Sequence, residues 1–216
     1  PLYKKYNFKK LLKPTKHYLS EKSYINHNVD FTVMGFYINN DMFKIRDMKW
    51  KYDLLLYGFI NKAYPLRIKM LEIMSYLKLS KKVNVKIIEH PGYFSKINDD
   101  FPRNAELSKI INQSRFTLIS SSIFKLLVKK YYEVPMSGST IIGNIPPDYK
   151  DLLQDKVINV NQDADHKTIL LTIQKALNGE YRHIEKNSRE WGKQLAISQN
   201  FEEGYKNLCN IIETDK

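Results

Sequence analysis

The stretch "DLLLYGFINKAYPLRIKMLEIMSYLKLSKKVNVKII", residues 53–88, decides the fold class of this chain. It opens with an apolar run that ends at Gly58, which is the pattern of a short buried strand. A second apolar run, residues 83–88, predicts another strand. Between the two runs, apolar side chains recur at helical spacing: Leu66, Met70, Ile73 and Leu77. The stretch therefore predicts a strand–helix–strand unit of a parallel sheet.

The same alternation continues toward the C-terminus. Further strands are predicted over residues 116–119, 140–142 and 157–160, and helices over 105–112 and 148–154. A helix that Gly138 ends is predicted from about residue 130, and another that carries Ile169, Ile173 and Leu177 from near His166. Phe201, Tyr205, Leu208 and Ile212 indicate a final amphipathic helix. We therefore expect an α/β domain over residues 51–216, with a doubly wound, Rossmann-like parallel sheet and a C-terminal helix.

The first 50 residues show no domain core. Residues 6–20 have the pattern of a basic amphipathic helix that Pro14 interrupts, residues 30–38 have strand character, and residues 39–41 form a predicted turn. We expect residues 1–50 to be an N-terminal helical or linker extension, or the remnant of a neighbouring domain.

The composition limits the class of protein. The 216 residues are 43% hydrophobic and 12% aromatic, as in a packed globular protein, and no apolar segment is long enough for a membrane span. The single Cys209 and the absence of a signal-peptide pattern predict a reducing, cytoplasmic location. Because the chain begins at Pro1, we expect a piece of a longer polypeptide. The net charge of +12 favours phosphorylated ligands or polyanions.

Ligands of doubly wound sheets bind outside the carboxyl ends of the strands. This rule selects four places, residues 58–67, 90–93, 120–122 and 130–146, and we expect them to cluster in space. In the first, Lys62 and Arg67 near a helix N-terminus could hold a phosphate. The alternative is two basic side chains on a solvated loop.

The next two places have equally open interpretations. His90 and Tyr93 follow the second strand, where a base could stack on the tyrosine ring, or the histidine could cap a turn. Ser120, Ser121 and Ser122 lie between a strand and a predicted helix, where hydroxyls could bind phosphate or sugar oxygens or serve as an N-cap.

Glu133 is the strongest single candidate. A carboxylate can accept both vicinal hydroxyls of a ribose, and Gly138 would permit a close approach of the ligand. The alternative is an exposed helical glutamate that pairs with Lys129 or Lys130. We interpret Asp163 and Asp165, which precede a helix, as caps, and we predict no metal site.

In this order, these residues resemble the donor-binding C-terminal half of GT-B glycosyltransferases. The match is to group-1-related sequences with an "HPGY … SS … KYYE-x-x-x-SGS … GNIP" pattern, and it extends from about Asp41 to the C-terminus. The resemblance implies that Glu133 binds the donor ribose and that Lys62 and Arg67 bind the diphosphate. Further implied donor-binding residues are Gly58, Asn61, His90, Gly92, Tyr93, Ser121, Ser122, Lys130, Ser137, Gly138 and Ser139.

One position departs from the family pattern. Many relatives carry an acid eight residues before the equivalent of Glu133, whereas this chain has Lys125 there. The catalytic residues are therefore unassigned, with Lys125 and Lys130 as candidates for stabilising the leaving diphosphate.

The resemblance implies transfer of a sugar from a nucleoside-diphosphate donor, with UDP favoured, to a glycan or another hydroxyl acceptor, without a metal. It also implies either further domains of the same polypeptide, with residues 1–50 as the remnant of the acceptor domain, or a reduced glycosyltransferase that uses residues 1–50 and the loop 93–104 for the acceptor. Two alternatives stay open: a nucleotide-sugar binding module without turnover, and a nucleic-acid-binding domain that uses the basic segment 1–24. We expect no nucleic-acid partner, because only net charge favours the last alternative.

Overall fold

A computed structural model of the chain describes residues 10–13, 30–33, 38–90, 102 and 104–198. The strands are β1 (Lys10–Lys13), β2 (Asp30–Val33), β3 (Tyr52–Gly58), β4 (Val85–Glu89), β5 (Ser114–Ile119), β6 (Thr140–Gly143) and β7 (Val157–Asn159). The helices are α3 (Pro65–Ser80), α4 (Asn104–Asn112), α5 (Lys130–Met136), η2 (Pro147–Tyr149), α6 (Lys150–Leu153), α7 (His166–Leu177) and α8 (Arg182–Ser198).

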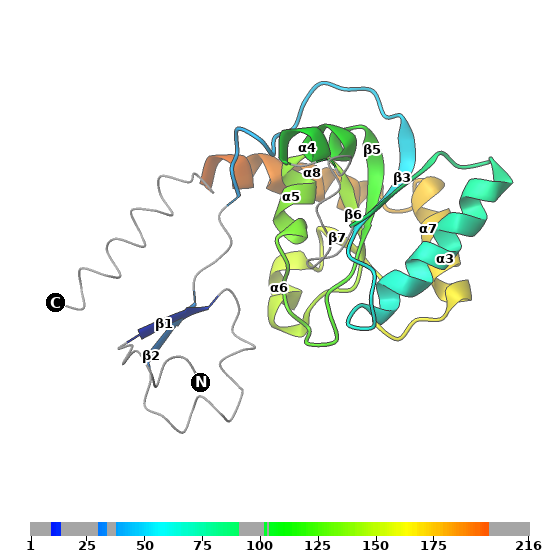
Figure 1. Cartoon of the computed structure of the whole chain (residues 1–216). Helices are drawn as coiled ribbons and strands as arrows, with labels where there is room; N and C mark the ends of the chain where they lie inside the picture. The colour runs from blue at the N-terminus through cyan, green and yellow to red at the C-terminus, as the bar shows by residue number, and fades with distance from the viewer. Residues whose placement is uncertain (1–9, 14–29, 34–37, 91–101, 103, 199–216) are drawn as a thin grey trace.

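Five parallel strands form the central sheet, in the order β4-β3-β5-β6-β7 (Figure 1). The chain passes from β3 to β4 on one side and then crosses to β5 on the other side of β3. Strand β3 therefore borders the point at which the strand order reverses, which is where ligands bind in such sheets. The predicted parallel α/β sheet is confirmed.

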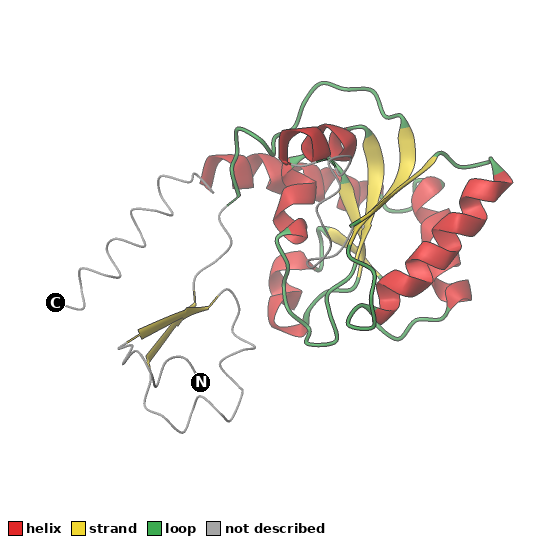
Figure 2. Cartoon of the chain, in the orientation of Figure 1, coloured by secondary structure: helices red, strands yellow, loops and turns green. Residues whose placement is uncertain are grey.

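Helices cover both faces of the sheet (Figure 2). Helices α4 and α5 lie on one face, and α3 and α7 lie on the other. Helix α8 packs Trp191 and Leu195 in the first layer, whereas Ile184 near its start packs in the second. Strand β3 shows why residues 54–57 are all apolar: Leu55 and Tyr57 face the first layer, and Leu54 and Leu56 face the second. Residues 54–58 are all buried because helices close both sides, whereas Tyr52 and Asp53 are half-buried.

The N-terminal segment differs from the expectation over residues 10–13. Residues 10–13 form the strand β1, which pairs in parallel with β2, rather than part of a helix. Pro14 explains this, because the residue before a proline is held away from helical backbone angles. The predicted turn at residues 39–41 is present, with the Asn39 side chain accepting hydrogen bonds from the Asp41 and Met42 amides.

Part of the expected linker packs onto the domain. Ile38 and Phe43 are buried in the first core layer. The Arg46 guanidinium donates to the Ser108 hydroxyl at 2.7 Å, and the Arg46 amide donates to the Asn112 side chain at 2.7 Å. The segment 38–46 is therefore held against α4.

Helix α8 was not predicted from the sequence, and the helix that was predicted near residues 201–212 lies outside the described residues. The buried apolar residues of α8 are sparse: Ile184, Trp191 and Leu195. Spacings of seven and four residues keep them on one helix face, but they are too few to stand out among the charged residues. At Gly192 the helix approaches α5 so closely that a Cβ would lie 1.9 Å from the Pro135 carbonyl oxygen.

We predict that Gly192→Ala destabilises the domain by about 1–3 kcal/mol, because the added methyl group would overlap backbone atoms of α5. In an uncrowded helix the same change would be stabilising. Urea unfolding followed by circular dichroism checks the prediction. Gln194→Ala, on an exposed position of α8, serves as the control with little effect. Equal or greater stability of the Gly192→Ala variant would contradict this close packing.

Candidate functional site

The carboxyl ends of β3 and β4 and the start of α5 surround a pocket of about 360 Å³, called here the edge pocket. Its lining residues are Tyr57, Gly58, Phe59, Tyr64, Arg67, His90, Leu107, Val128, Lys129, Lys130 and Glu133. Five predicted site residues thus meet here: Gly58, Arg67, His90, Lys130 and Glu133. The volume suits a small-molecule ligand.

Gly58 makes room for a lysine at the end of β3. Its φ angle is +109°, and a Cβ at this position would lie 1.7 Å from the Lys130 Nζ. The Lys130 amine donates to the Tyr57 carbonyl at 2.7 Å and lies 4.2 Å from the centre of the Tyr57 ring. Any larger residue at position 58 would both strain the backbone and displace this amine.

Arg67 supplies a second cation to the same pocket. It is only 2% exposed, and its guanidinium donates to the Phe59 carbonyl at 2.9 Å and to the Ser120 carbonyl at 2.7 Å. The guanidinium also stacks over the Tyr64 ring at 4.0 Å. These contacts from two loops fix the side chain in place before any ligand binds.

Glu133 points into the pocket, as the ribose-binding hypothesis requires. The Tyr57 hydroxyl donates to its carboxylate at 3.3 Å. Burial raises the pKa of Glu133, and the nearby Lys130 charge and the Tyr57 hydrogen bond oppose that rise. The carboxylate is therefore half-buried beside a cation, rather than paired with a lysine on an exposed surface.

The two cations perturb each other and their neighbours. Burial, and next the charge of Arg67, hold the pKa of Lys130 well below its usual value, although Glu133 raises it. Burial and the Lys130 charge also lower the pKa of His90. Its ring is thus neutral at physiological pH, and it meets Phe59 edge to face at 6.1 Å. A bound anion would relieve the repulsion between the cations.

The loop after β3 contributes structure more than ligand contacts. The Asn61 side chain accepts the Ala63 amide at 3.0 Å, which shapes the turn. Lys62 is exposed, and neither residue lines the edge pocket. Lys62 thus stays a prediction, whereas Arg67 reaches the pocket.

The serines after β5 do not precede a helix, which corrects the sequence interpretation. Residues 120–129 form a loop, and α5 begins only at Lys130. The Ser121 amide and hydroxyl bind the Asn144 side chain at 2.9 and 2.6 Å, and the Ser122 hydroxyl accepts the Phe124 amide at 3.3 Å. Both buried hydroxyls are therefore committed to the loop and do not line the edge pocket.

Ser137, Gly138 and Ser139 lie at the opposite edge of the sheet, so their predicted role in donor binding is wrong. Helix α5 runs from the carboxyl edge back to the amino edge, where β6 begins. There the Ser137 hydroxyl contacts the Ser108 hydroxyl at 2.9 Å, and the Ser139 hydroxyl contacts Thr117 at 2.8 Å. These groups satisfy one another in the core.

The remaining candidates fall elsewhere. Gly92 and Tyr93 lie outside the described residues. Lys125 is exposed and lines a second cavity, away from Glu133. Asp165 caps α7 through the Thr168 amide at 2.7 Å, as predicted. Among the described residues, no group of three or more His, Cys, Asp or Glu side chains could hold a metal ion.

Three aromatic lining residues were not selected from the sequence. Tyr57, Phe59 and Tyr64 supply the ring faces and the hydroxyl of the edge pocket. The available signal was that Tyr57 and Phe59 flank Gly58 at the exit of a buried strand and that Tyr64 precedes Pro65 at the start of the next helix. In the described part of the chain, no helix is long and apolar enough to span a membrane.

Comparison with solved structures shows the fold. The pneumococcal O-GlcNAc transferase GtfA, solved with UDP and GlcNAc, has a TM-score of 0.64 at 14% identity, over 98% of this chain and 46% of GtfA. Sucrose-phosphate synthase from Thermosynechococcus elongatus has a TM-score of 0.63 at 10% identity, over 95% of this chain and 58% of the synthase. A mutant of S. aureus TarM was solved with fondaparinux, alpha-GlcNAc-glycerol and UDP. It has a TM-score of 0.63 at 8% identity, over 97% of this chain and 46% of TarM.

The chain thus has the fold of one half of a GT-B glycosyltransferase, as the sequence resemblance implied. It spans about half the length of these three proteins. No family model matches the chain, and no curated protein sequence matches it significantly.

We predict that Glu133→Gln stabilises the ligand-free protein at neutral pH. Because the pKa of Glu133 is raised in the folded state, the folded protein loses stability as the pH rises through that pKa. Glutamine is uncharged, so it avoids this loss of stability, and its side-chain oxygen can still accept a hydrogen bond from the Tyr57 hydroxyl. The melting temperature of the variant should exceed that of the wild type at neutral pH and converge with it below pH 4.5. A variant that is less stable at neutral pH would contradict the buried carboxylate.

Proposed function

We propose that this chain is the donor-binding part of a glycosyltransferase that transfers a sugar from a nucleoside-diphosphate sugar to a hydroxyl acceptor. One observation carries the proposal: a half-buried carboxylate and two cations converge around Gly58, at the reversal point of the sheet. A nucleoside diphosphate presents the complementary groups, namely vicinal hydroxyls and a diphosphate.

Each part of the donor has a partner in the edge pocket. Glu133 binds the ribose hydroxyls, and Arg67 and Lys130 bind the diphosphate. The rings of Phe59 and His90 also line the pocket and offer aromatic surfaces for a base. GtfA and the TarM mutant were both solved in complex with UDP, which supports UDP as the nucleotide.

The same cations would act in the chemical step. Glycosyl transfer leaves negative charge on the departing diphosphate, and fixed cations in a partly dry pocket stabilise that charge. Lys130 and Arg67 can supply this stabilisation without a metal ion. The general base would come from a part of the polypeptide outside this domain.

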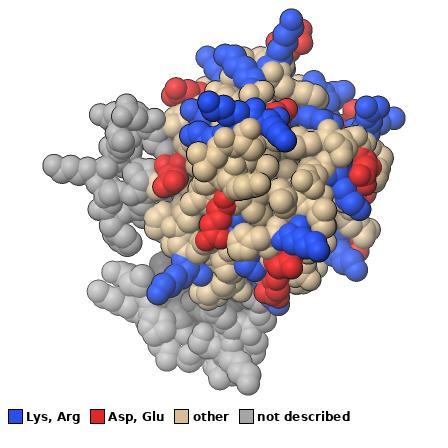
Figure 3. Space-filling model, turned by 90° about the vertical axis from the view of Figure 1, so that its right-hand side faces the viewer, with Lys and Arg blue, Asp and Glu red and all other residues tan. Residues whose placement is uncertain are grey.

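The charge of the face shown in Figure 3 does not favour the nucleic-acid alternative. On the face shown in Figure 3, Lys and Arg side chains lie among Asp and Glu side chains rather than in one continuous basic area. The non-catalytic alternative makes the same binding predictions as the enzyme. Release of free sugar from a bound donor separates the two.

We predict that the protein binds UDP or a UDP-sugar and that Glu133→Ala weakens binding about 10- to 100-fold, because two charge-assisted hydrogen bonds are lost. Calorimetric titration with UDP, GDP and their sugars measures this. The matched control is Glu190→Ala, an exposed glutamate on α8. If the wild type binds no nucleotide, the proposed function fails. Oligonucleotide binding that survives Glu133→Ala would favour the alternative instead.

We also predict that nucleotide affinity falls at alkaline pH, beginning below the ordinary lysine pKa of 10.5. A diphosphate binds the protonated amine, and Lys130 loses its proton early because burial and Arg67 lower its pKa. Above that pKa the affinity should fall about tenfold per pH unit. Lys130→Arg should remove the fall, whereas Lys175→Arg on α7 should not. A pH profile that is unchanged in the Lys130→Arg variant would exclude this role.

A further inference from the structure

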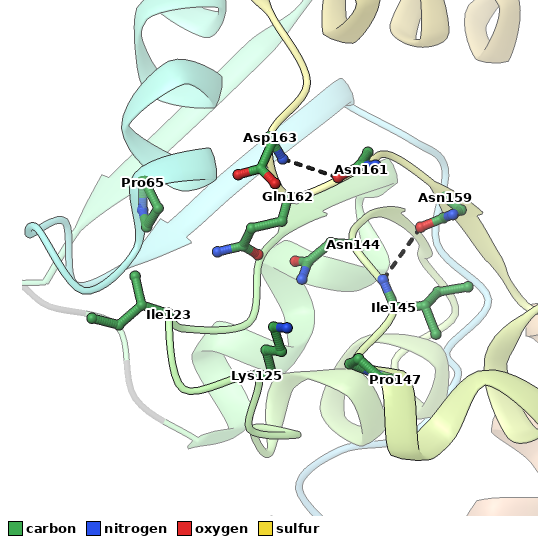
Figure 4. A pocket seen from close by; sticks show the side chains of 10 residues that line it. All are labelled: Pro65, Ile123, Lys125, Asn144, Ile145, Pro147, Asn159, Asn161, Gln162 and Asp163. Carbon is green, nitrogen blue, oxygen red and sulfur yellow. Dashed lines mark hydrogen bonds between the residues drawn. The ribbon is translucent and has the colours of Figure 1, made fainter.

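A second cavity, of about 480 Å³, opens at the carboxyl ends of β5, β6 and β7 (Figure 4). We call it the amide cavity. It is lined by Pro65, Ile123, Lys125, Asn144, Ile145, Pro147, Asn159, Asn161, Gln162 and Asp163. None of these residues lines the edge pocket. The proposed donor site therefore does not account for this cavity.

Two joined loops separate the cavities. The Ile123 amide donates to the Ala63 carbonyl at 2.8 Å, which ties the loop after β5 to the loop after β3. Ile123 and Pro65 line the amide cavity, whereas Tyr64 lines the edge pocket. A ligand can therefore bind in one cavity without a ligand in the other cavity.

The amide side chains are oriented by the protein itself. The Asn159 oxygen accepts the Ile145 amide at 3.3 Å, and the Asn161 oxygen accepts the Asp163 amide at 3.1 Å. The side-chain nitrogens of Asn159 and Asn161 are left as donors, with no hydrogen bond to another described residue. Asn144, bound to Ser121, is held in the cavity wall.

Gln162 carries an unsatisfied acceptor. Its Oε1 atom is buried and has no hydrogen-bond partner in the described part of the chain. Figure 4 shows the Gln162 side chain extending between Asp163 and Asn144. A buried acceptor without a donor is costly, and a ligand hydroxyl would satisfy it.

The charges of the lining disfavour an anionic ligand. Lys125 and Asp163 contribute one charge of each sign, unlike the paired cations of the edge pocket. The other side chains are amides, together with the apolar groups of Pro65, Ile123, Ile145 and Pro147. Amides bind hydroxyls as donors and acceptors, and apolar groups pack against the C–H face of a ring.

We propose that the amide cavity is a second binding site, which takes a neutral carbohydrate ring independently of the nucleotide. The assignment of this ring to the acceptor rests on the proposed function. The proposal that the cavity binds a carbohydrate does not rest on it.

The test is a titration of the ¹⁵N-labelled protein with the methyl glycosides of glucose, galactose and N-acetylglucosamine, observed through the side-chain amide signals. At least one glycoside should shift the signals of Asn159, Asn161 and Gln162, and UDP alone should not. Gln162→Leu should weaken that binding about tenfold. Gln194→Leu, on an exposed position of α8, is the matched control.

The outcomes separate this inference from the proposed function. If no glycoside shifts the three amides, or if only an intact UDP-sugar does, the independent carbohydrate site is overturned. If a glycoside binds with equal affinity after Glu133→Ala, the site is supported even where nucleotide titration fails. Nucleotide binding without glycoside binding would leave the proposed function standing and this inference refuted.

Discussion

The candidate site depends on one contact, that of the Lys130 amine with the end of β3. The amine donates to the Tyr57 carbonyl at 2.7 Å and fills the space that a side chain at position 58 would need. Because β3 is a central strand at the reversal point of the sheet, this contact holds the start of α5 at the place where ligands bind. Glu133, nearly one helical turn later, then faces the same pocket and meets the Tyr57 hydroxyl.

Burial disfavours the charged forms of both Lys130 and Glu133. Burial and the neighbouring Arg67 charge lower the pKa of Lys130, and burial raises the pKa of Glu133. The hydrogen bonds of Lys130 and Glu133 with Tyr57 hold these groups in place, together with the packing of α5 between the sheet and α8. A ligand with hydroxyls and a diphosphate would complement both charges, as the proposed donor role requires.

Helix α5 also explains why neighbouring residues in the sequence have different roles. The helix runs from the carboxyl edge to the amino edge of the sheet, so Glu133 lies in the pocket while Ser137 contacts Ser108 in the core. The sequence resemblance grouped both residues in one donor site. Their separation follows from the rise of a helix along its axis, which carries the chain across the layer.

The sequence by itself determined the type and order of the elements from β3 to α7, because apolar runs and helical spacing are local patterns. It also indicated Gly58, Arg67 and Glu133, since a glycine at a strand exit and an acid in an apolar helix are locally unusual. Helix α8 was missed because its few buried residues do not form a strong period.

Only the tertiary structure decided which candidates meet. Tyr57 and Glu133 are 76 residues apart and are joined by strand order and helix direction, which no local pattern encodes. The serines after β5 are a second example. Asn144, in the loop after the adjacent strand β6, donates a hydrogen bond to the Ser121 hydroxyl, which from the sequence alone could have bound a ligand.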